Sequence, residues 1–154
     1  MHTELIGFLL QCFAVAAVID IGKDNAAHSS HMFNFSNQDY GYVASHKAYG
    51  TKSYKPNRNW TLTLTDLNTT YLEVDFISYK LISKRTQLGA CSDYLLIATR
   101  VNETKVCKSS PGLIYFYLSL NKPNVSFTFK TDGYKESTGF WITLKSKLRV
   151  LIYE

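Results

Sequence analysis

The stretch WTLTLT, residues 60 to 65, alternates large apolar side chains with threonines. In an extended chain Trp60, Leu62 and Leu64 lie on one side, because successive side chains of a β-strand point to opposite faces. The period of two predicts a strand with one face in a core and the other in water. The same alternation returns in Val125-Ser-Phe-Thr-Phe129.

Short runs of β-branched and aromatic residues continue on both sides of this stretch, separated by Asn, Pro and Gly. No helical period interrupts them. The expected strands cover residues 60–65, 71–76, 94–99, 113–118, 125–129 and 140–144. Strands at this spacing predict an all-β fold, an antiparallel β-sandwich. A chain of 154 residues has room for one such domain with a core of its own.

The two ends of the chain differ from this pattern. Residues 5–18 are apolar but shorter than the roughly 20 residues of a membrane helix, so residues 1–17 are predicted to be a signal peptide. Because the opening MHTE lacks Lys and Arg, an uncleaved anchor or an apolar first strand is the alternative. Residues 18–38 are predicted to be a flexible lead-in, because the chain from Gly22 to about Gln38 has no apolar period. Residues 147–154 are predicted to be an extension or an edge strand. No stable membrane insertion is expected.

Asparagine sequons indicate the compartment. Five occur in this short chain, which favours a secreted, extracellular glycoprotein; they are Asn34, Asn59, Asn68, Asn102 and Asn124. Outside the leader the cysteines are Cys91 and Cys107, and an even count in an oxidising compartment argues for one disulfide. A zinc site is disfavoured, because two cysteines 16 positions apart do not form paired CxxC groups. His28 and His31 lie in a polar stretch and are interpreted as part of a solvated linker.

The order of these features resembles a CUB domain, an extracellular β-sandwich module, over residues 39–146. The matching pieces are Gly41-Tyr-Val-Ala-Ser45, Tyr54-Lys-Pro-Asn57, Trp60, the apolar strand at Leu72, Val74 and Phe76, Cys91-Ser-Asp-Tyr-Leu-Leu-Ile97, Cys107, Val125-Ser-Phe-Thr-Phe-Lys-Thr-Asp132 and Gly139-Phe140. The resemblance implies a Cys91–Cys107 disulfide that closes a hairpin. The family's first disulfide is missing, since Arg58 stands at the position of its cysteine.

The resemblance also implies a calcium site, formed in the family by two aspartates and a glutamate. Asp93 and Asp132 match the aspartates, but Ile82 falls at the position of the glutamate, and Lys84 and Arg85 follow it. These cations would repel a divalent ion. We therefore expect both aspartates to bond loop amides or a lysine, with calcium as the alternative and no other cofactor.

Recognition rather than catalysis is the function that the resemblance implies. Neither H-E-x-x-H nor G-x-S-x-G occurs, so the chain is not expected to be an enzyme. The formal net charge of +5 favours an acidic partner, either an extracellular protein or a glycan. The candidate contact residues are Tyr79, Lys80, Lys84 and Arg85 in one loop, and Lys130, Tyr134 and Lys135 in another.

Two alternatives belong to other classes. A structural or matrix component would assemble through the apolar run at residues 147–153, which has the character of an exposed edge strand. A defence protein is the other alternative, and it rests on family analogy alone. Nucleic acid is not an expected partner, because the basic residues are scattered and glycans at the sequons would crowd the surface.

Overall fold

The computed structural model describes residues 16–22, 26–36, 40–67, 69–82, 91–107, 109–118, 124–134 and 136–147. They form ten strands: β1 (Ala17–Gly22), β2 (His28–Asn34), β3 (Tyr40–His46), β4 (Asn59–Thr65), β5 (Tyr71–Lys80), β6 (Tyr94–Ala98), β7 (Glu103–Val106), β8 (Leu113–Tyr117), β9 (Val125–Lys130) and β10 (Gly139–Lys147). All six predicted strands are present. Within the described ranges there is no helix that could cross a membrane.

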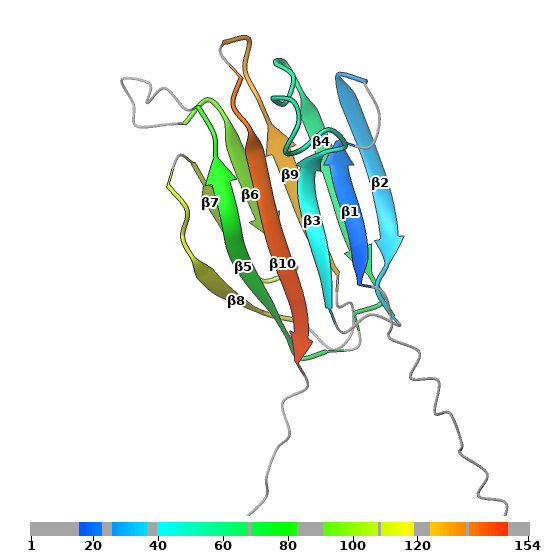
Figure 1. The fold of residues 1–154 in the computed structure, drawn as a ribbon. Coiled ribbons are helices and arrows are strands. Elements are labelled where there is room, and N and C mark those ends of the chain that lie inside the picture. Colours follow the sequence, from blue (N-terminus) through cyan, green and yellow to red (C-terminus); the bar gives the residue numbers. More distant parts are fainter. Residues whose placement is uncertain are drawn as a thin grey trace, which may run out of the picture.

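The strands form two five-stranded sheets packed face to face (Figure 1). Sheet A has the order β1-β3-β10-β5-β8, and sheet B has the order β2-β4-β9-β6-β7. Most neighbours are antiparallel, but β1 runs parallel to β3 and β2 runs parallel to β4. The predicted all-β sandwich is confirmed, with one parallel pair at an edge of each sheet.

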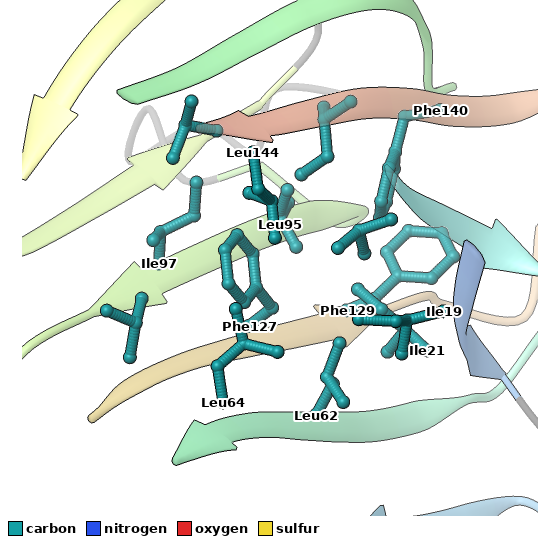
Figure 2. Packing of buried hydrophobic residues seen from close by; sticks show 14 of the residues in the cluster. Ile19, Ile21, Leu62, Leu64, Leu95, Ile97, Phe127, Phe129, Phe140 and Leu144 are labelled. Carbon is teal, nitrogen blue, oxygen red and sulfur yellow. The ribbon is translucent and has the colours of Figure 1, made fainter. Parts of the chain in front are cut away.

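The alternation that predicted the strands also builds the core. Leu62 and Leu64 are fully buried, while the threonines between them are half-exposed on the outer face of sheet B. Figure 2 shows Phe127, Phe129 and Leu95 from sheet B pointing into the same layer as Phe140 and Leu144 from sheet A. Burying an apolar side chain of this size stabilises the fold by about 1.5–3 kcal/mol. The two apolar faces therefore hold the sheets together.

The prediction of a flexible lead-in over residues 18–38 is wrong, because two strands lie within it. In β1, Ile19 and Ile21 alternate with more exposed residues and enter the core. In β2, His28 to Asn34 alternates between exposed and half-buried positions along one edge of sheet B, so His28 and His31 belong to a strand and not to a linker. The weakly apolar sequence of β2 is typical of an edge strand, since only one flank is covered.

The junction between β1 and β2 lies against Trp60. The indole Nε1 donates a hydrogen bond of 2.8 Å to the carbonyl oxygen of Ala26. A Cβ atom at Gly22 would overlap the Trp60 ring, so only glycine allows the backbone to pass this closely. Trp60 is 2% exposed, which confirms its predicted place in the core.

A β-bulge in β5 changes which side chains face the core. The register with β10 shifts between Trp141 and Ile142, and Ile77 is the extra residue. As a result both Phe76 and Tyr79 point inward, with ring centroids 5.4 Å apart. Strict alternation from Phe76 would have pointed Tyr79 outward.

The predicted C-terminal element begins inside a strand. Lys147 is the last residue of β10 and pairs with Tyr71 of β5, so it belongs to the middle of sheet A. Residues 148–154, which carry the rest of that prediction, lie outside the described residues. The same is true of residues 1–15 of the predicted signal peptide, while Ala17 begins β1.

Candidate functional site

The cysteines predicted to pair do form a disulfide. Cys91 and Cys107 are joined, with their Cα atoms 5.8 Å apart. The chain between them forms the antiparallel hairpin β6–β7, in which Ala98 pairs with Glu103. We call this end of the sandwich the disulfide end. It also holds the last residues of β5 and β9 and the first residues of β4 and β10.

Asp93 is the centre of a hydrogen-bond network at the disulfide end. It is 1% exposed. The Tyr54 hydroxyl donates to Oδ2 at 2.6 Å, and the Asp132 amide donates to Oδ1 at 2.8 Å. The carboxylate of Asp132 in turn accepts a bond from the Tyr134 amide at 2.9 Å. Both aspartates thus bond loop amides, and Asp93 ties together three segments that are distant in sequence.

Electrostatics at Asp93 work against ionisation. Burial raises the pKa of this carboxyl above its ordinary value, and the nearby Asp132 carboxylate raises the pKa further. The hydrogen bonds from Tyr54 and the Asp132 amide oppose the rise in pKa, because they favour the charged form. The Tyr54 hydroxyl also accepts a bond from the Ile82 amide at 3.1 Å, so it holds the chain before residue 83 as well.

Among the described residues, the side chains around Asp93 and Asp132 do not supply a complete set of calcium ligands. Calcium takes six to eight oxygen ligands, of which carboxylates supply the balancing charge. In the described part of the chain no three His, Cys, Asp or Glu side chains gather in one place. Both oxygens of Asp93 already accept hydrogen bonds. Residues 83–90 contain Lys84 and Arg85 but no acidic residue.

The predicted contact residues are divided by the structure. Lys80 and Lys130 are exposed at the ends of β5 and β9, and Tyr134 is 63% exposed. Tyr79 was predicted to be a surface contact, and this is wrong. Its ring is stacked on Phe140, and its hydroxyl donates to the Val106 carbonyl oxygen at 2.7 Å. The remaining candidates, Lys84, Arg85 and Lys135, lie outside the described residues.

A serine and a histidine meet beneath the loop after β3, but they do not form an accessible catalytic pair. Ser45 Oγ and His46 Nδ1 are 2.8 Å apart. Ser45 is fully buried, and its hydroxyl oxygen accepts a bond from the Phe140 amide at 3.2 Å. His46 Nε2 bonds the Lys52 carbonyl oxygen at 2.9 Å. The pair therefore fixes the loop to β10.

The sequon asparagines that the structure describes are exposed, and each lies in a strand of sheet B or directly next to one. Asn34 ends β2 and Asn59 begins β4. Asn102 lies in the turn between β6 and β7, and Asn124 directly precedes β9. Asn124 also borders a hollow of about 300 Å³ on the outer face of sheet B. The fifth sequon asparagine, Asn68, lies outside the described residues.

The outer face of sheet A carries a different set of side chains, which the sequence analysis missed. They are two groups of aromatic rings, namely Tyr40, Tyr42, Tyr49 and Trp141 over β3 and β10, and Tyr71, Tyr115 and Tyr117 over β5 and β8. The centroids of contacting rings are 5.1–6.3 Å apart. We call this surface the tyrosine face. The sequence feature that could have indicated this surface is the presence of tyrosines at positions of the predicted strands that face away from the core.

Charged and polar residues lie between the two aromatic groups. Lys145 of β10 pairs with Glu73 of β5 on one side and with Tyr40 of β3 on the other. In the next row, Thr143 pairs with Asp75 and with Tyr42. Opposite charges at directly paired positions of an antiparallel sheet attract each other. The tyrosine face thus has apolar flanks and a charged centre.

The fold is similar to several solved structures. The CUB1-EGF-CUB2 domains of rat MASP-1 match with 18% identity and a TM-score of 0.58, over 77% of this chain and 43% of that chain. The extracellular region of zebrafish Gpr126/Adgrg6 matches with 15% identity and a TM-score of 0.60, over 80% of this chain and 15% of that one. A MASP-1 CUB2 domain bound to Ca²⁺ matches with 16% identity and a TM-score of 0.59, over 75% and 97%. No family model matches the sequence, and no curated protein does.

These matches establish a CUB-like fold, in agreement with the resemblance found in the sequence. The rat and zebrafish structures are longer than this chain, which spans 43% of the first and 15% of the second.

Proposed function

We propose that this chain, whose fold is that of a CUB domain, is a secreted, N-glycosylated binding module that recognises another extracellular protein with its tyrosine face. The observation that carries the proposal is that the two sheets present different kinds of residues at their outer faces. The described sequons lie in or next to strands of sheet B, whereas the two groups of neighbouring aromatic rings at the surface lie on sheet A.

Glycans and protein partners compete for surface. A chain of sugars is bulky and hydrated, so it keeps macromolecules away from the face that carries it. A patch of Tyr, Trp and charged residues instead favours contact with another protein. Aromatic residues are enriched at protein interfaces, and complementary charges orient a partner. Tyr117 is 69% exposed and Ile77 is 60% exposed on the tyrosine face. The sheet without described sequons is therefore the one suited to contact.

Secretion is part of the proposal. It is supported by the apolar leader, the sequons and the Cys91–Cys107 disulfide, because disulfides persist in oxidising compartments. A role without catalysis is supported by the burial of Ser45 and by the hydrogen bonds that occupy His46.

A glycan placed on the tyrosine face tests the proposal. Lys145→Asn with Lys147→Thr creates an N-S-T sequon at positions 145–147 of β10, the middle strand of sheet A. The glycosylated variant and the unchanged chain are each used to capture proteins from extracellular fluid. We expect the glycan to abolish capture of the partner, because a sugar chain at position 145 separates the two surfaces.

Two control variants separate the glycan from other effects. Thr63→Asn creates an N-L-T sequon at positions 63–65 of β4 in sheet B without altering any natural sequon, and it should leave capture unchanged. Lys145→Asn with Lys147→Ala removes the same two charges without adding a sequon. Loss of capture with Thr63→Asn, together with retention in the β10 glycan variant, would refute the assignment to sheet A.

An acidic glycan is the second candidate ligand, and one arrangement on sheet B favours it. The Lys105 ammonium lies 3.9 Å from the centre of the Tyr94 ring, and Tyr94 pairs directly with Lys130. Two exposed cations beside an aromatic ring suit a sulfated sugar. Heparin-column elution tests this candidate, because Lys105→Gln with Lys130→Gln should lower the eluting salt concentration if these residues bind. Equal elution of the variant and the unchanged chain would exclude them.

A further inference from the structure

Strand β8 is one outer edge of sheet A, as Figure 1 shows. It pairs with β5 on one side, and the structure describes no strand on its other side. The Leu118 amide donates to the Thr70 carbonyl oxygen at 2.9 Å, and the Phe76 amide donates to the Gly112 carbonyl oxygen at 3.0 Å. Since hydrogen-bonded positions recur every second residue in an antiparallel pair, the even-numbered residues of β8 bond to β5.

The odd-numbered residues of β8 consequently direct their backbone groups away from the sheet. They are Leu113, Tyr115 and Tyr117, and their side chains are also 46%, 48% and 69% exposed. Each of these residues presents an amide and a carbonyl to the open edge, next to an apolar side chain on the tyrosine face. The three residues are spaced symmetrically about Tyr115.

The open edge of β8 lacks the features that usually prevent strands from pairing. Edge strands are normally protected by charged side chains, proline or a bulge. The five residues of β8, LIYFY, contain no charge and no proline. In contrast β7, the edge of sheet B on the same side, carries Glu103 and Lys105, and β1 carries Asp20. An apolar edge with outward backbone groups is a template for another strand.

We propose that β8 pairs antiparallel with β8 of a second copy of this chain, around a two-fold axis at Tyr115. In this register Tyr115 faces Tyr115 of the second copy, and Leu113 faces Tyr117 of the second copy. Each facing pair exchanges two backbone hydrogen bonds, because all three residues point their amides and carbonyls to the edge. The two A sheets become one continuous sheet of ten strands.

A second copy suits this edge better than an unrelated strand for two reasons. The register is self-complementary, so every outward amide finds a carbonyl without any other sequence being required. The edge is also uncharged, so identical copies do not repel each other. The nearest charges, Glu73 and Asp75 of β5, lie three strand spacings or about 14 Å from those of the second copy, beyond the Debye length of roughly 8 Å.

Charge-swapped variants test both the dimer and its register. Leu113→Lys with Tyr117→Lys places like charges opposite each other in the dimer, and Leu113→Glu with Tyr117→Glu does the same with the opposite sign. Sedimentation of the whole secreted chain should show a dimer. Each double variant should weaken dimerisation by at least about 100-fold. Mixing the two variants should restore a heterodimer, since every Lys then faces a Glu.

A second pair of variants tests the backbone contribution. Tyr115→Pro removes the outward amide without disturbing the pairing with β5, because that amide points to the open edge. It should abolish the dimer, whereas Tyr115→Phe should preserve it. Circular dichroism verifies that each variant is folded. A monomeric parent chain at about 100 µM, or a dimer insensitive to these changes, would overturn the proposal.

Dimerisation through β8 and capture of a partner by the tyrosine face can be tested separately. The β10 glycan variant should lose partner capture and still dimerise, because β5 separates Lys145 from β8. The lysine double variant should lose the dimer even when no other protein is present.

Discussion

Removal of one hydroxyl, in Tyr54→Phe, tests the network at the disulfide end. The variant keeps the buried ring, which lies 5.2 Å from Phe129, and loses only the polar atom. The lost bond to Asp93 Oδ2 is short and involves a carboxylate, which corresponds to about 1.5–3 kcal/mol. The lost bond from the Ile82 amide adds about 0.5–1.5 kcal/mol. We expect the free energy of unfolding to fall by about 2–4 kcal/mol at pH 7.

The pH dependence of this loss has a definite sign. Because burial raises the pKa of Asp93, the folded state binds more protons than the unfolded state from about pH 3.8 up to the raised pKa. Stability from this group therefore decreases as pH rises through that window. Without the Tyr54 hydroxyl the pKa rises further, so the variant loses more stability at pH 7 than at pH 4.

Urea denaturation at both pH values measures the effect. Tyr117→Phe is the matched control, since its exposed ring should change stability by less than about 0.5 kcal/mol. In an Asp93→Asn background the loss caused by Tyr54→Phe should be smaller, because the charged acceptor is gone. A loss below about 1 kcal/mol at pH 7, or one that is equal at the two pH values, would refute the role assigned to this hydroxyl.

Three further predictions concern other parts of the fold. Cys91→Ala with Cys107→Ala should lower the unfolding free energy by about 3 kcal/mol, as urea denaturation will measure, because the bridge closes a loop with a separation of 16 residues. An unchanged midpoint would contradict this. Gly139→Ala should cost about 3 kcal/mol, because Gly139 has φ of 91° and a Cβ would overlap Ser45 Oγ. Adding Ser45→Ala should recover part of that cost, and no recovery would place the strain elsewhere. Millimolar calcium should shift the thermal midpoint by less than about 1 °C, and a rise of several degrees that Asp93→Asn removes would contradict our reading of the donor set.

The strands that could be predicted from the sequence are those in which apolar and polar residues alternate along the strand itself. In β4 and β9 one face is apolar and the other is hydroxyl-rich, so the period of two is visible without tertiary context. The Cys91–Cys107 pairing and the CUB-like fold followed from the order of short motifs along the chain.

Features that depend on neighbours were missed. β2 has the sequence HSSHMFN, and it becomes a strand because β4 offers it a parallel edge. Tyr79 is buried because the bulge at Ile77 shifts the phase of β5, and the sequence contains no separate mark of a bulge. The tyrosine face required knowledge of which strands are adjacent, since its rings come from β3, β5, β8, β10 and the loop after β3.

Site-specific photocrosslinking tests most directly whether sheet A is the binding face. A photoreactive phenylalanine analogue replaces Ile77, which is 60% exposed on sheet A, or Met32, which is 76% exposed on the outer face of sheet B. Each glycosylated chain is irradiated in extracellular fluid, and the adducts are identified by mass. Our account predicts that position 77 yields an adduct with another protein and that position 32 does not. An adduct from position 32 alone would contradict it.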